Sequence, residues 1–210
     1  LQQALLDVDG GGASSVVALC EDIVVDTTPL SVKTTRGGGL TLVGCCGGED
    51  RTSKKCVIQG SGNTRNLVVN GGGDFTIQNI AIVGGRCNGP VDGGGANLKY
   101  SGSGDIHIID SELRDGSCAS EGGNLRVDTT GDVYMKGSRF DGGDGWIVGG
   151  AAILDARDVQ IDECEFVNNL GSGLGRYLGS GSSIMVNNSF FKDNDSEWST
   201  IFSPGIEYSL

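Results

Sequence analysis

The stretch Asp158-Val159-Gln160-Ile161-Asp162-Glu163-Cys164-Glu165-Phe166-Val167-Asn168-Asn169 decides the fold, because similar copies of it recur along the chain. The other copies start at Asp74, Asp105, Asp132 and Ser183, so successive copies are 31, 27, 26 and 25 residues apart. A period of this length is typical of stacked structural repeats. Such a stack is expected to place equivalent residues of neighbouring repeats in contact.

Three aligned positions of the copies keep their character: apolar, then mostly small, then large and apolar. The first position is Ile77, Ile108, Met135, Ile161 and Val186. The second position, three residues further on, is Ile80, Ser111, Ser138, Cys164 and Ser189. The third position is Ile82, Leu113, Phe140, Phe166 and Phe191. These rows predict a core made of layers of like residues.

Short alternating segments within each copy predict β-strands. Two such segments are separated by a polar or small residue, and a third is predicted at residues 96–100, 123–127 and 151–154. Three short strands in about 25 residues match one coil of a parallel β-helix, in which neighbouring coils pair about 4.8 Å apart. The predicted fold class is therefore all-β, a right-handed parallel β-helix of about six or seven coils.

Other repeat folds fit less well. A β-sandwich needs hairpin turns and does not stack like residues at one period. A propeller blade needs about 40 residues, and the Leu/Asn pattern of leucine-rich repeats is absent. The calcium-binding nonapeptide repeat has only a partial, isolated match at Gly102-Ser103-Gly104-Asp105-Ile106.

The chain is predicted to form one domain with a cap at each end. Residues 1–12 begin with helical spacing and predict a short N-terminal helix that covers the first coil. Residues 13–195 form the β-helix. Residues 196–210 break the repeat and are expected to be a C-terminal cap or tail.

Composition limits the classes of partner. The net charge is −12 and the pI is about 4.3, which argues against nucleic acid and anionic membranes as partners. No stretch approaches the roughly 18 apolar residues that a membrane-spanning helix needs, so membrane insertion is not expected. No signal peptide is visible, and residue 1 is read as a mature or an arbitrary start. Seven cysteines and two N-x-S sequons predict a secreted, extracellular or cell-surface protein.

Two short motifs resemble a known family. Phe166-Val167-Asn168-Asn169 and Phe191-Lys192-Asp193-Asn194 match the F-x-x-N half of the polymorphic outer membrane protein repeat, and Gly149-Gly150-Ala151-Ala152-Ile153 resembles its G-G-A-I half with one extra Ala. Phe140-Asp141-Gly142-Gly143 departs from the motif, because it lacks the final Asn. Family members of this type are implied to be surface adhesins or passengers.

The wider resemblance is to right-handed β-helices of the pectate-lyase-like superfamily, over about residues 13–195. The run Leu42-Val43-Gly44-Cys45-Cys46, followed by Lys55-Cys56-Val57-Ile58-Gln59-Gly60, looks like the opening coils of secreted, cysteine-bearing members. Members of this superfamily are often polysaccharide-active enzymes, so the resemblance implies fold more specifically than function.

Cysteine spacing predicts a set of disulfides. Cys87 and Cys118 are one repeat step apart, so they occupy one position in neighbouring coils, within the Cα distance that a disulfide requires. A second disulfide is predicted between Cys46 and Cys56 across a polar loop, with Cys45 as the rival partner of Cys56.

The remaining cysteines follow from these pairs. Cys20 would then meet Cys45 in the neighbouring coil, although this pairing stays open. Cys164 lies in the small inward row, which predicts a buried free thiol. A role as nucleophile would need a paired base, and no histidine matches it.

Catalytic chemistry has weak support in the sequence. The single histidine, His107, is expected to face outward and has no partner for a triad. The most enzyme-like set is outward Lys99 and Arg126 with Asp128 and Asp155 near the following turns, which resembles the basic group and carboxylates of a polysaccharide lyase. A solvated charged face is the simpler interpretation. No catalytic residue, cofactor or metal is assigned.

Charged residues recur at other aligned positions. Glu112, Arg139 and Glu165 occupy one outward position in three successive coils and predict a stabilising charge ladder. Acids and amides after the second strand are explained by turn chemistry, with a calcium site of stacked Asp141 and Asp193 as the alternative.

Two sequons predict N-glycosylation, at Asn187 and at Asn194. Asn194 is favoured because it lies in a predicted turn. Asn187 is less certain, because the serine of its sequon is predicted to point inward.

Three functions remain open. The leading hypothesis is a secreted, disulfide-stabilised, non-catalytic module with a structural, adhesive or glycan-contacting role, whose partner is an extracellular or cell-wall polysaccharide or another extracellular protein. The first alternative is a polysaccharide lyase or hydrolase. The second is a docking subunit of a larger assembly, with apolar contacts at Trp146, Trp198 and Phe202.

Overall fold

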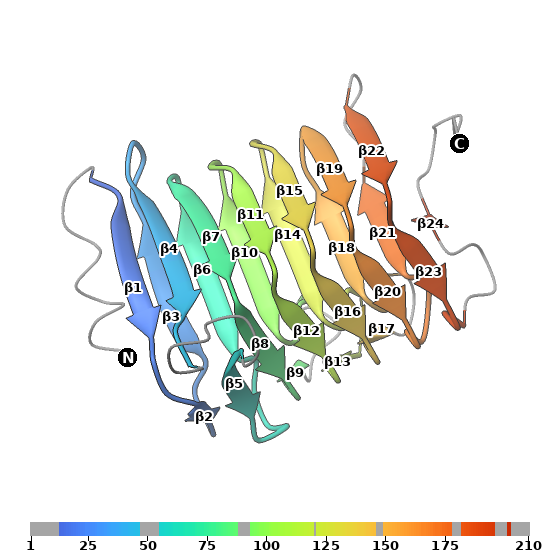
Figure 1. Ribbon diagram of the computed structural model, residues 1–210, viewed down its shortest axis with the longest axis horizontal. Helices are drawn as coiled ribbons and strands as arrows, with labels where there is room; N and C mark the ends of the chain where they lie inside the picture. The colour runs from blue at the N-terminus through green and yellow to red at the C-terminus, as the bar shows by residue number, and fades with distance from the viewer. Residues whose placement is uncertain are drawn as a thin grey trace.

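The computed structural model describes residues 13–46, 55–87, 93–119, 121–145, 149–177, 182–195 and 201–202. Over these ranges the chain is all-β and winds into a parallel β-solenoid of about six turns (Figure 1). The predicted fold class is confirmed. The predicted helix at residues 1–12 and most of the segment 196–210 lie outside the described residues.

Three seven-stranded parallel sheets form the walls of the solenoid. Sheet A consists of β1 (Ser15–Leu19), β4 (Gly39–Gly44), β7 (Asp74–Gln78), β11 (Ile106–Ile109), β15 (Val133–Lys136), β19 (Asp158–Asp162) and β22 (Ser183–Asn187). Sheet B consists of β2 (Ile23–Val25), β5 (Cys56–Gly60), β8 (Ile80–Val83), β12 (Glu112–Arg114), β16 (Arg139–Asp141), β20 (Glu165–Val167) and β23 (Phe190–Lys192). Sheet C consists of β3 (Leu30–Thr34), β6 (Leu67–Gly71), β10 (Leu98–Gly102), β14 (Leu125–Thr129), β18 (Ala152–Asp155), β21 (Leu174–Tyr177) and β24 (Ile201–Phe202).

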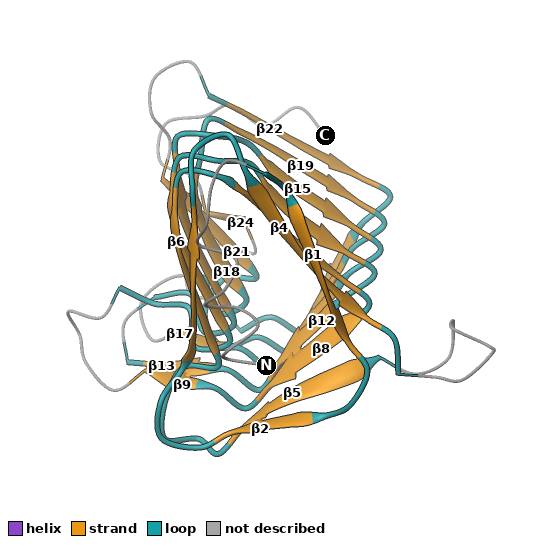
Figure 2. Cartoon of the chain, turned by 90° about the vertical axis from the view of Figure 1, so that its left-hand side faces the viewer, coloured by secondary structure: helices purple, strands orange, loops and turns teal. Residues whose placement is uncertain are grey.

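The chain visits the sheets in the order A, B, C in every coil. Seen from the N-terminal end, it passes down sheet A, through sheet B and back up sheet C, turning clockwise as it recedes (Figure 2). This is a right-handed coil, the hand expected for parallel strands joined by crossovers. A fourth, short sheet D lies between sheets B and C and consists of β9 (Arg86–Cys87), β13 (Ser117–Cys118) and β17 (Asp144–Gly145).

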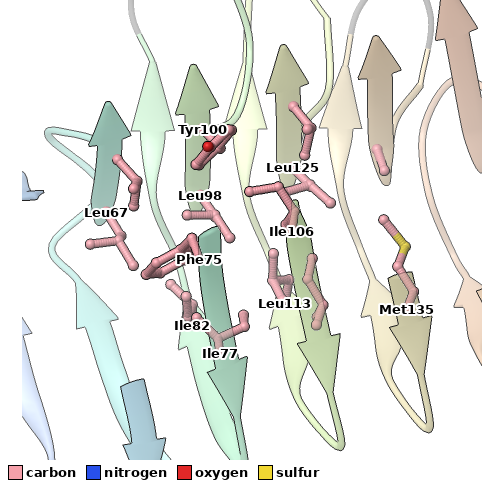
Figure 3. Packing of buried hydrophobic residues seen from close by; sticks show 14 of the residues in the cluster. Leu67, Phe75, Ile77, Ile82, Leu98, Tyr100, Ile106, Leu113, Leu125 and Met135 are labelled. Carbon is pink, nitrogen blue, oxygen red and sulfur yellow. The ribbon is translucent and has the colours of Figure 1, made fainter. Parts of the chain in front are cut away.

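The predicted rows of like residues stack in register. The first row runs through sheet A from Ile77 to Val186, with each residue paired to its equivalent in the next coil. In the third row, the rings of Phe140, Phe166 and Phe191 are stacked, with centroids 4.8 and 4.6 Å apart. Figure 3 shows side chains from all three walls meeting in this core. Burying such rings in a dry interior is a main source of the solenoid's stability.

The corner between sheets A and B explains the break in each alternating segment. One residue there adopts a left-handed backbone, with φ between 46° and 58°, and these residues are Asn79, Asp110, Gly137, Glu163 and Asn188. Gly, Asn and Asp tolerate this conformation best, which accounts for the polar or small character of the position. Three of these residues are followed by a serine, Ser111, Ser138 or Ser189, whose hydroxyl donates to the backbone of the corner, as Ser138 does to the Lys136 carbonyl at 2.9 Å.

The third strands begin later than predicted, and the cause is a buried row of asparagines. Strand β10 starts at Leu98 and β14 at Leu125, because Asn97 and Asn124 turn into the corner that precedes sheet C. The Nδ2 atom of Asn66 donates to Oδ1 of Asn97 at 3.0 Å, and Nδ2 of Asn97 donates to Oδ1 of Asn124 at 2.8 Å. This amide ladder joins three successive coils at a position that the alternation pattern does not reveal.

Candidate functional site

The structure brings the predicted lyase-like residues together on sheet C, but the basic group at their centre is shielded from a substrate. Lys99 pairs with Arg126 in register, and Asp128 pairs with Asp155. The guanidinium of Arg126 donates from Nε to Asp128 at 2.8 Å, donates again from Nη2 to the same carboxylate, and contacts Glu121 from Nη1 at 3.1 Å. Only 14% of its side chain is exposed. The basic group at the centre of the set is therefore enclosed by carboxylates rather than presented to a substrate.

The protonation of Arg126 also disfavours a role as proton acceptor. Burial acts to lower the pKa of its guanidinium, but the hydrogen bond that it donates to Asp128 and the charges of Asp128, Glu121 and Asp155 outweigh burial and raise the pKa. A general base must lose its proton near the working pH. The backbone at Gly95 also packs closely against Arg126, since a Cβ added to Gly95 would lie 2.8 Å from Cβ of Arg126. This cluster is best described as an internal ion-pair network.

Cys164 is buried and carries a free thiol, as the sequence predicts. Desolvation by burial raises the pKa of this thiol to about 11, and hydrogen bonds to the backbone of Ser138 and Asp162 only partly offset it. A thiol with this pKa is protonated at neutral pH and is a poor nucleophile. Cys164 therefore fills the row that Ser111 and Ser138 occupy in the preceding coils.

The structure joins the other six cysteines in three disulfides. Cys87 and Cys118 pair between β9 and β13 with Cα atoms 4.8 Å apart, and Cys46 pairs with Cys56 with Cα atoms 5.0 Å apart. The pairing left open by the sequence is Cys20 with Cys45, whose Cα atoms are 4.7 Å apart. The Cys20–Cys45 disulfide thus fastens the first coil to the second at the corner between sheets A and B, whereas Cys46–Cys56 links the end of β4 to the start of β5 within the second coil.

The single histidine lies on the outer face of sheet A. The rings of His107 and Tyr134 stack at 4.9 Å, with 13° between their planes. The stack runs along the solenoid axis, so the rings face each other and offer their edges to solvent. This geometry is less suited to holding a sugar ring than a flat aromatic platform would be. The two rings instead form a cross-strand aromatic pair on the outer surface of sheet A.

A bidentate ion pair that the sequence reasoning missed lies beside this stack. Arg157 donates from Nε and Nη2 to the two carboxylate oxygens of Asp132 at 2.8 and 2.7 Å, and the Tyr134 hydroxyl donates to the same carboxylate at 3.2 Å. The Arg157 hydrogen bond is the main reason that the pKa of Asp132 lies below its usual value, while burial opposes the shift. The carboxylate is fully engaged in structural contacts.

The predicted charge ladder on sheet B forms in part. Glu112, Arg139 and Glu165 stand in register, and Arg139 pairs with Glu165 at 2.5 Å and with Asp141 at 2.8 Å. Glu112 instead contacts Arg114 at 3.5 Å. The calcium alternative fails, because Asp141 lies on β16 and Asp193 follows β23, two strands further along sheet B. Among the described residues, no cluster of metal-ligating side chains occurs.

An open cleft lies at the corner between sheets A and B, along the first five coils. Its volume is about 710 Å³. Ala18 and Val43 form an apolar part of the lining, and Lys55, Gln78, Asn79 and Asp110 supply polar groups. Gly44 and Gly137, which lack side chains, and the disulfide-bonded Cys45 complete it. The volume falls in the range of small-molecule sites.

The cleft residues are set by the coil repeat, and each of five successive levels contributes at least one of them. Ala18, Val43 and Gln78 pair in register on β1, β4 and β7, Asn79 holds the left-handed corner position at the level of Gln78, and Asp110 holds that of the next level. Five levels at about 4.8 Å spacing make the cleft about 19 Å long. The Asn79 side chain donates to the Gly44 carbonyl at 2.9 Å, which fixes it in place. Polar groups thus line the three middle levels of the cleft, one after another along the solenoid axis.

The two predicted glycosylation acceptors occupy different environments. Asn187 ends β22 on the outer face of sheet A and is exposed. Asn194 turns inward and bonds Asn169 and the Phe166 carbonyl. Trp146 and Trp198, expected as apolar docking contacts, lie outside the described residues, as does the side chain of Phe202.

No protein-family model, curated protein or solved structure matches this chain. In the part of the chain that the structure describes, no helix is long and apolar enough to cross a membrane.

Proposed function

We propose that the protein is an extracellular β-solenoid module that holds a polysaccharide along the cleft at the corner of sheets A and B without cleaving it. The elongated polar cleft carries this proposal. Its lining supplies an ammonium group, two amides and a carboxylate, which together donate to and accept from hydroxyl groups. Three disulfides in a chain of 210 residues fit an oxidising extracellular environment.

The direction of the cleft favours a glycan over a peptide. An extended peptide gains most of its affinity by pairing with a free strand edge. The cleft runs across the strands, and between these coils the backbone groups of sheet A already pair with one another. A ligand must therefore be recognised by side chains alone, and these recur at the spacing between neighbouring coils. A chain of hydroxyl-bearing rings offers such repeated groups.

The charge of the site favours a neutral polymer. The described lining has one positive group, Lys55, and one negative group, Asp110. The whole chain carries a net charge of −12, which repels a polyanion. A uronide polymer, the substrate class that the lyase hypothesis implies, is less well matched than a neutral extracellular or cell-wall polysaccharide.

A binding screen with matched variants tests the proposal. Purified protein is screened against neutral and acidic oligosaccharides on a glycan array, and binders are measured by calorimetry with Asp110→Asn and Glu163→Gln proteins. Both variants remove one carboxylate from a left-handed corner position, but only Asp110 lines the cleft. We expect Asp110→Asn to weaken binding about tenfold or more and Glu163→Gln to leave it unchanged.

Two results would overturn the proposal. One is the absence of binding to every glycan on the array, and the other is an equal loss in both variants. Incubation of the bound polysaccharide with the protein, followed by chromatography of the products, separates binding from cleavage. Shortened products would favour the lyase or hydrolase alternative.

A further inference from the structure

The last coil contains two N-glycosylation sequons, and their asparagines lie in different environments. Asn187-Asn188-Ser189 and Asn194-Asp195-Ser196 both satisfy the N-x-S pattern. An acceptor must carry a bulky, solvated glycan on its Nδ2 atom. The folded coil therefore limits which of the two asparagines a native molecule can carry in glycosylated form.

Asn194 belongs to an inward amide pair. Its Nδ2 atom donates to the Phe166 carbonyl at 2.8 Å, and its Oδ1 atom accepts from the backbone N–H and from Nδ2 of Asn169, at 3.1 and 2.8 Å. The surroundings are close, because a Cβ built on Gly173 would lie 3.2 Å from Nδ2 of Asn194. A sugar on this nitrogen would have to displace the neighbouring coil.

Asn187 has the opposite arrangement. It is the last residue of β22, where side chains alternate between the core and solvent, and it falls on the exposed side. Its in-register partner is Asp162, on the outer face of sheet A. The backbone carbonyl of Asn187 accepts from Glu163 N–H at 3.2 Å and from the Ser189 hydroxyl at 2.7 Å. The backbone is thus fixed while the amide side chain points away from the core.

We infer that Asn187 is N-glycosylated in the folded, exported protein and that Asn194 is not. This inference rests on the extracellular location in the proposed function. In the transfer, Nδ2 of Asn187 forms a bond to the anomeric carbon of a lipid-pyrophosphate-linked oligosaccharide. The bond between that carbon and the pyrophosphate oxygen breaks, the lipid pyrophosphate leaves with the electron pair, and the amide gives one proton to a base of the transferase.

The position of Asn187 suits a glycan in two ways. The cleft ends at the level of Gly137, and Asn187 lies two strands further along sheet A, so the glycan leaves the cleft open. Met185, on the same strand and the same face, is 56% exposed. A glycan on Asn187 would shield this apolar side chain from solvent.

Expression in a eukaryotic secretory host tests the inference with three single variants. Glycopeptide mass spectrometry of the secreted wild type is expected to find one occupied site, Asn187. The Asn187→Gln variant is expected to lose the glycan and keep its midpoint of thermal unfolding within a few degrees. The Asn194→Gln variant is expected to keep the glycan and unfold at lower temperature, because the inward amide bonds are disturbed.

Ser196→Ala is the matched control, because it removes the second sequon and leaves the Asn194 amide intact. It is expected to change neither the glycan nor the thermal midpoint. Two results for the secreted wild type would overturn the inference: a glycan on Asn194, or an unoccupied Asn187. Wild-type protein that stays inside the cell without any glycan would also overturn it. A failed glycan-array screen with Asn187 occupied would reject only the proposed cleft function.

Discussion

At the residue scale, Asn97 is the central member of the buried amide ladder. Its Oδ1 accepts from Asn66 and from the Gly85 backbone N–H, and its Nδ2 donates to Asn124 and to the Arg114 carbonyl. Three of the four partners keep a second hydrogen bond when the amide is removed, namely Asn66 with the Val83 carbonyl, the Arg114 carbonyl with Gly84 N–H, and Asn124 with Gly116 N–H. The buried Gly85 N–H loses its acceptor. Each lost hydrogen bond is worth about 0.5–1.5 kcal/mol, and a buried donor left without a partner adds a desolvation penalty of about 1–3 kcal/mol.

We therefore predict that Asn97→Ala lowers the free energy of unfolding by about 3–5 kcal/mol. Urea unfolding followed by circular dichroism measures this difference. The control is Asn70→Ala, since Asn70 is exposed on the outer side of sheet C and its loss should cost less than about 0.5 kcal/mol. Equal effects of the two substitutions would show that the ladder is not a buried hydrogen-bond network.

The Asp132–Arg157 pair gives a pH-dependent prediction. The pKa of Asp132 is depressed in the folded chain, mainly by the Arg157 hydrogen bond, whereas the pKa of an unfolded Asp is about 3.9. The unfolded chain binds this proton more readily, so the stabilisation is complete above about pH 4 and is lost as the pH falls below it.

Arg157→Gln is accordingly expected to destabilise the protein more at pH 6 than at pH 3. Urea unfolding at the two pH values measures this, and a carboxyl NMR titration of Asp132 should show its pKa rising in the variant. Lys136→Gln serves as the control, since it removes an exposed positive charge from the same sheet. A loss of stability in Arg157→Gln that is the same at both pH values would contradict the assignment.

At the scale of the element, each corner between sheets A and B depends on one left-handed residue. Glu163 holds this conformation with φ at 54°, although it is not a residue that favours it. The left-handed backbone costs a residue with a Cβ about 1–2 kcal/mol, and a β-branched residue is strained most.

Glu163→Val should therefore lower the free energy of unfolding by about 1–2 kcal/mol, and Glu163→Gly should leave it unchanged or raise it. Thermal and urea unfolding of the two variants give the comparison. Gln160→Val, at an exposed position within β19, should be tolerated because β-branched residues suit strands. A tolerated Glu163→Val would mean that the corner backbone differs from the one described.

The left-handed corner residues and the stacked core rows could be predicted from the sequence because they recur once in each copy of the repeat. Met135 and Ile161, or Phe140 and Phe166, align without a gap, and their stacking is confirmed. The asparagine ladder was missed because a buried amide looks like a turn residue in an alternation pattern. Its available signal was the Asn-Leu pair at residues 66–67, 97–98 and 124–125, which recurs at the repeat step.

The cleft was harder to predict for a different reason. Its residues come from five levels and a loop, and Gly44 and Gly137 contribute space rather than chemistry. No motif marks such a site, because its polar lining residues come from different coils. The lyase-like set could be found on sequence, but its enclosure by Glu121 and the loop glycines could not.

At the scale of the whole molecule, the core runs along the length of the solenoid and is built by contacts between neighbouring coils. The Cys87–Cys118 disulfide fastens two coils and closes a loop of 31 residues. In the chain-entropy model such a cross-link adds up to about 3.7 kcal/mol, chiefly by restricting the unfolded chain.

The double variant Cys87→Ser, Cys118→Ser is predicted to lose up to that amount of stability and to keep the β-rich circular dichroism spectrum. The paired rows of sheets A, B and C hold the same coils together without the bond. Chemical denaturation of the variant and of the oxidised wild type measures the difference. Loss of the folded spectrum in the variant would mean that the coils cannot stack without the covalent link.

The stacked solenoid requires one fixed register between neighbouring coils, and cysteine cross-linking tests that register directly. In a Cys164→Ser background, Gln160→Cys combined with Met185→Cys places two exposed thiols at paired positions of β19 and β22. Gln160→Cys combined with Asn187→Cys is the matched control, two residues out of register on the same face. Mild oxidation followed by mass spectrometry should show a disulfide in the first pair and free thiols in the second. Rapid cross-linking of the control pair, or none in the in-register pair, would contradict the stacked solenoid.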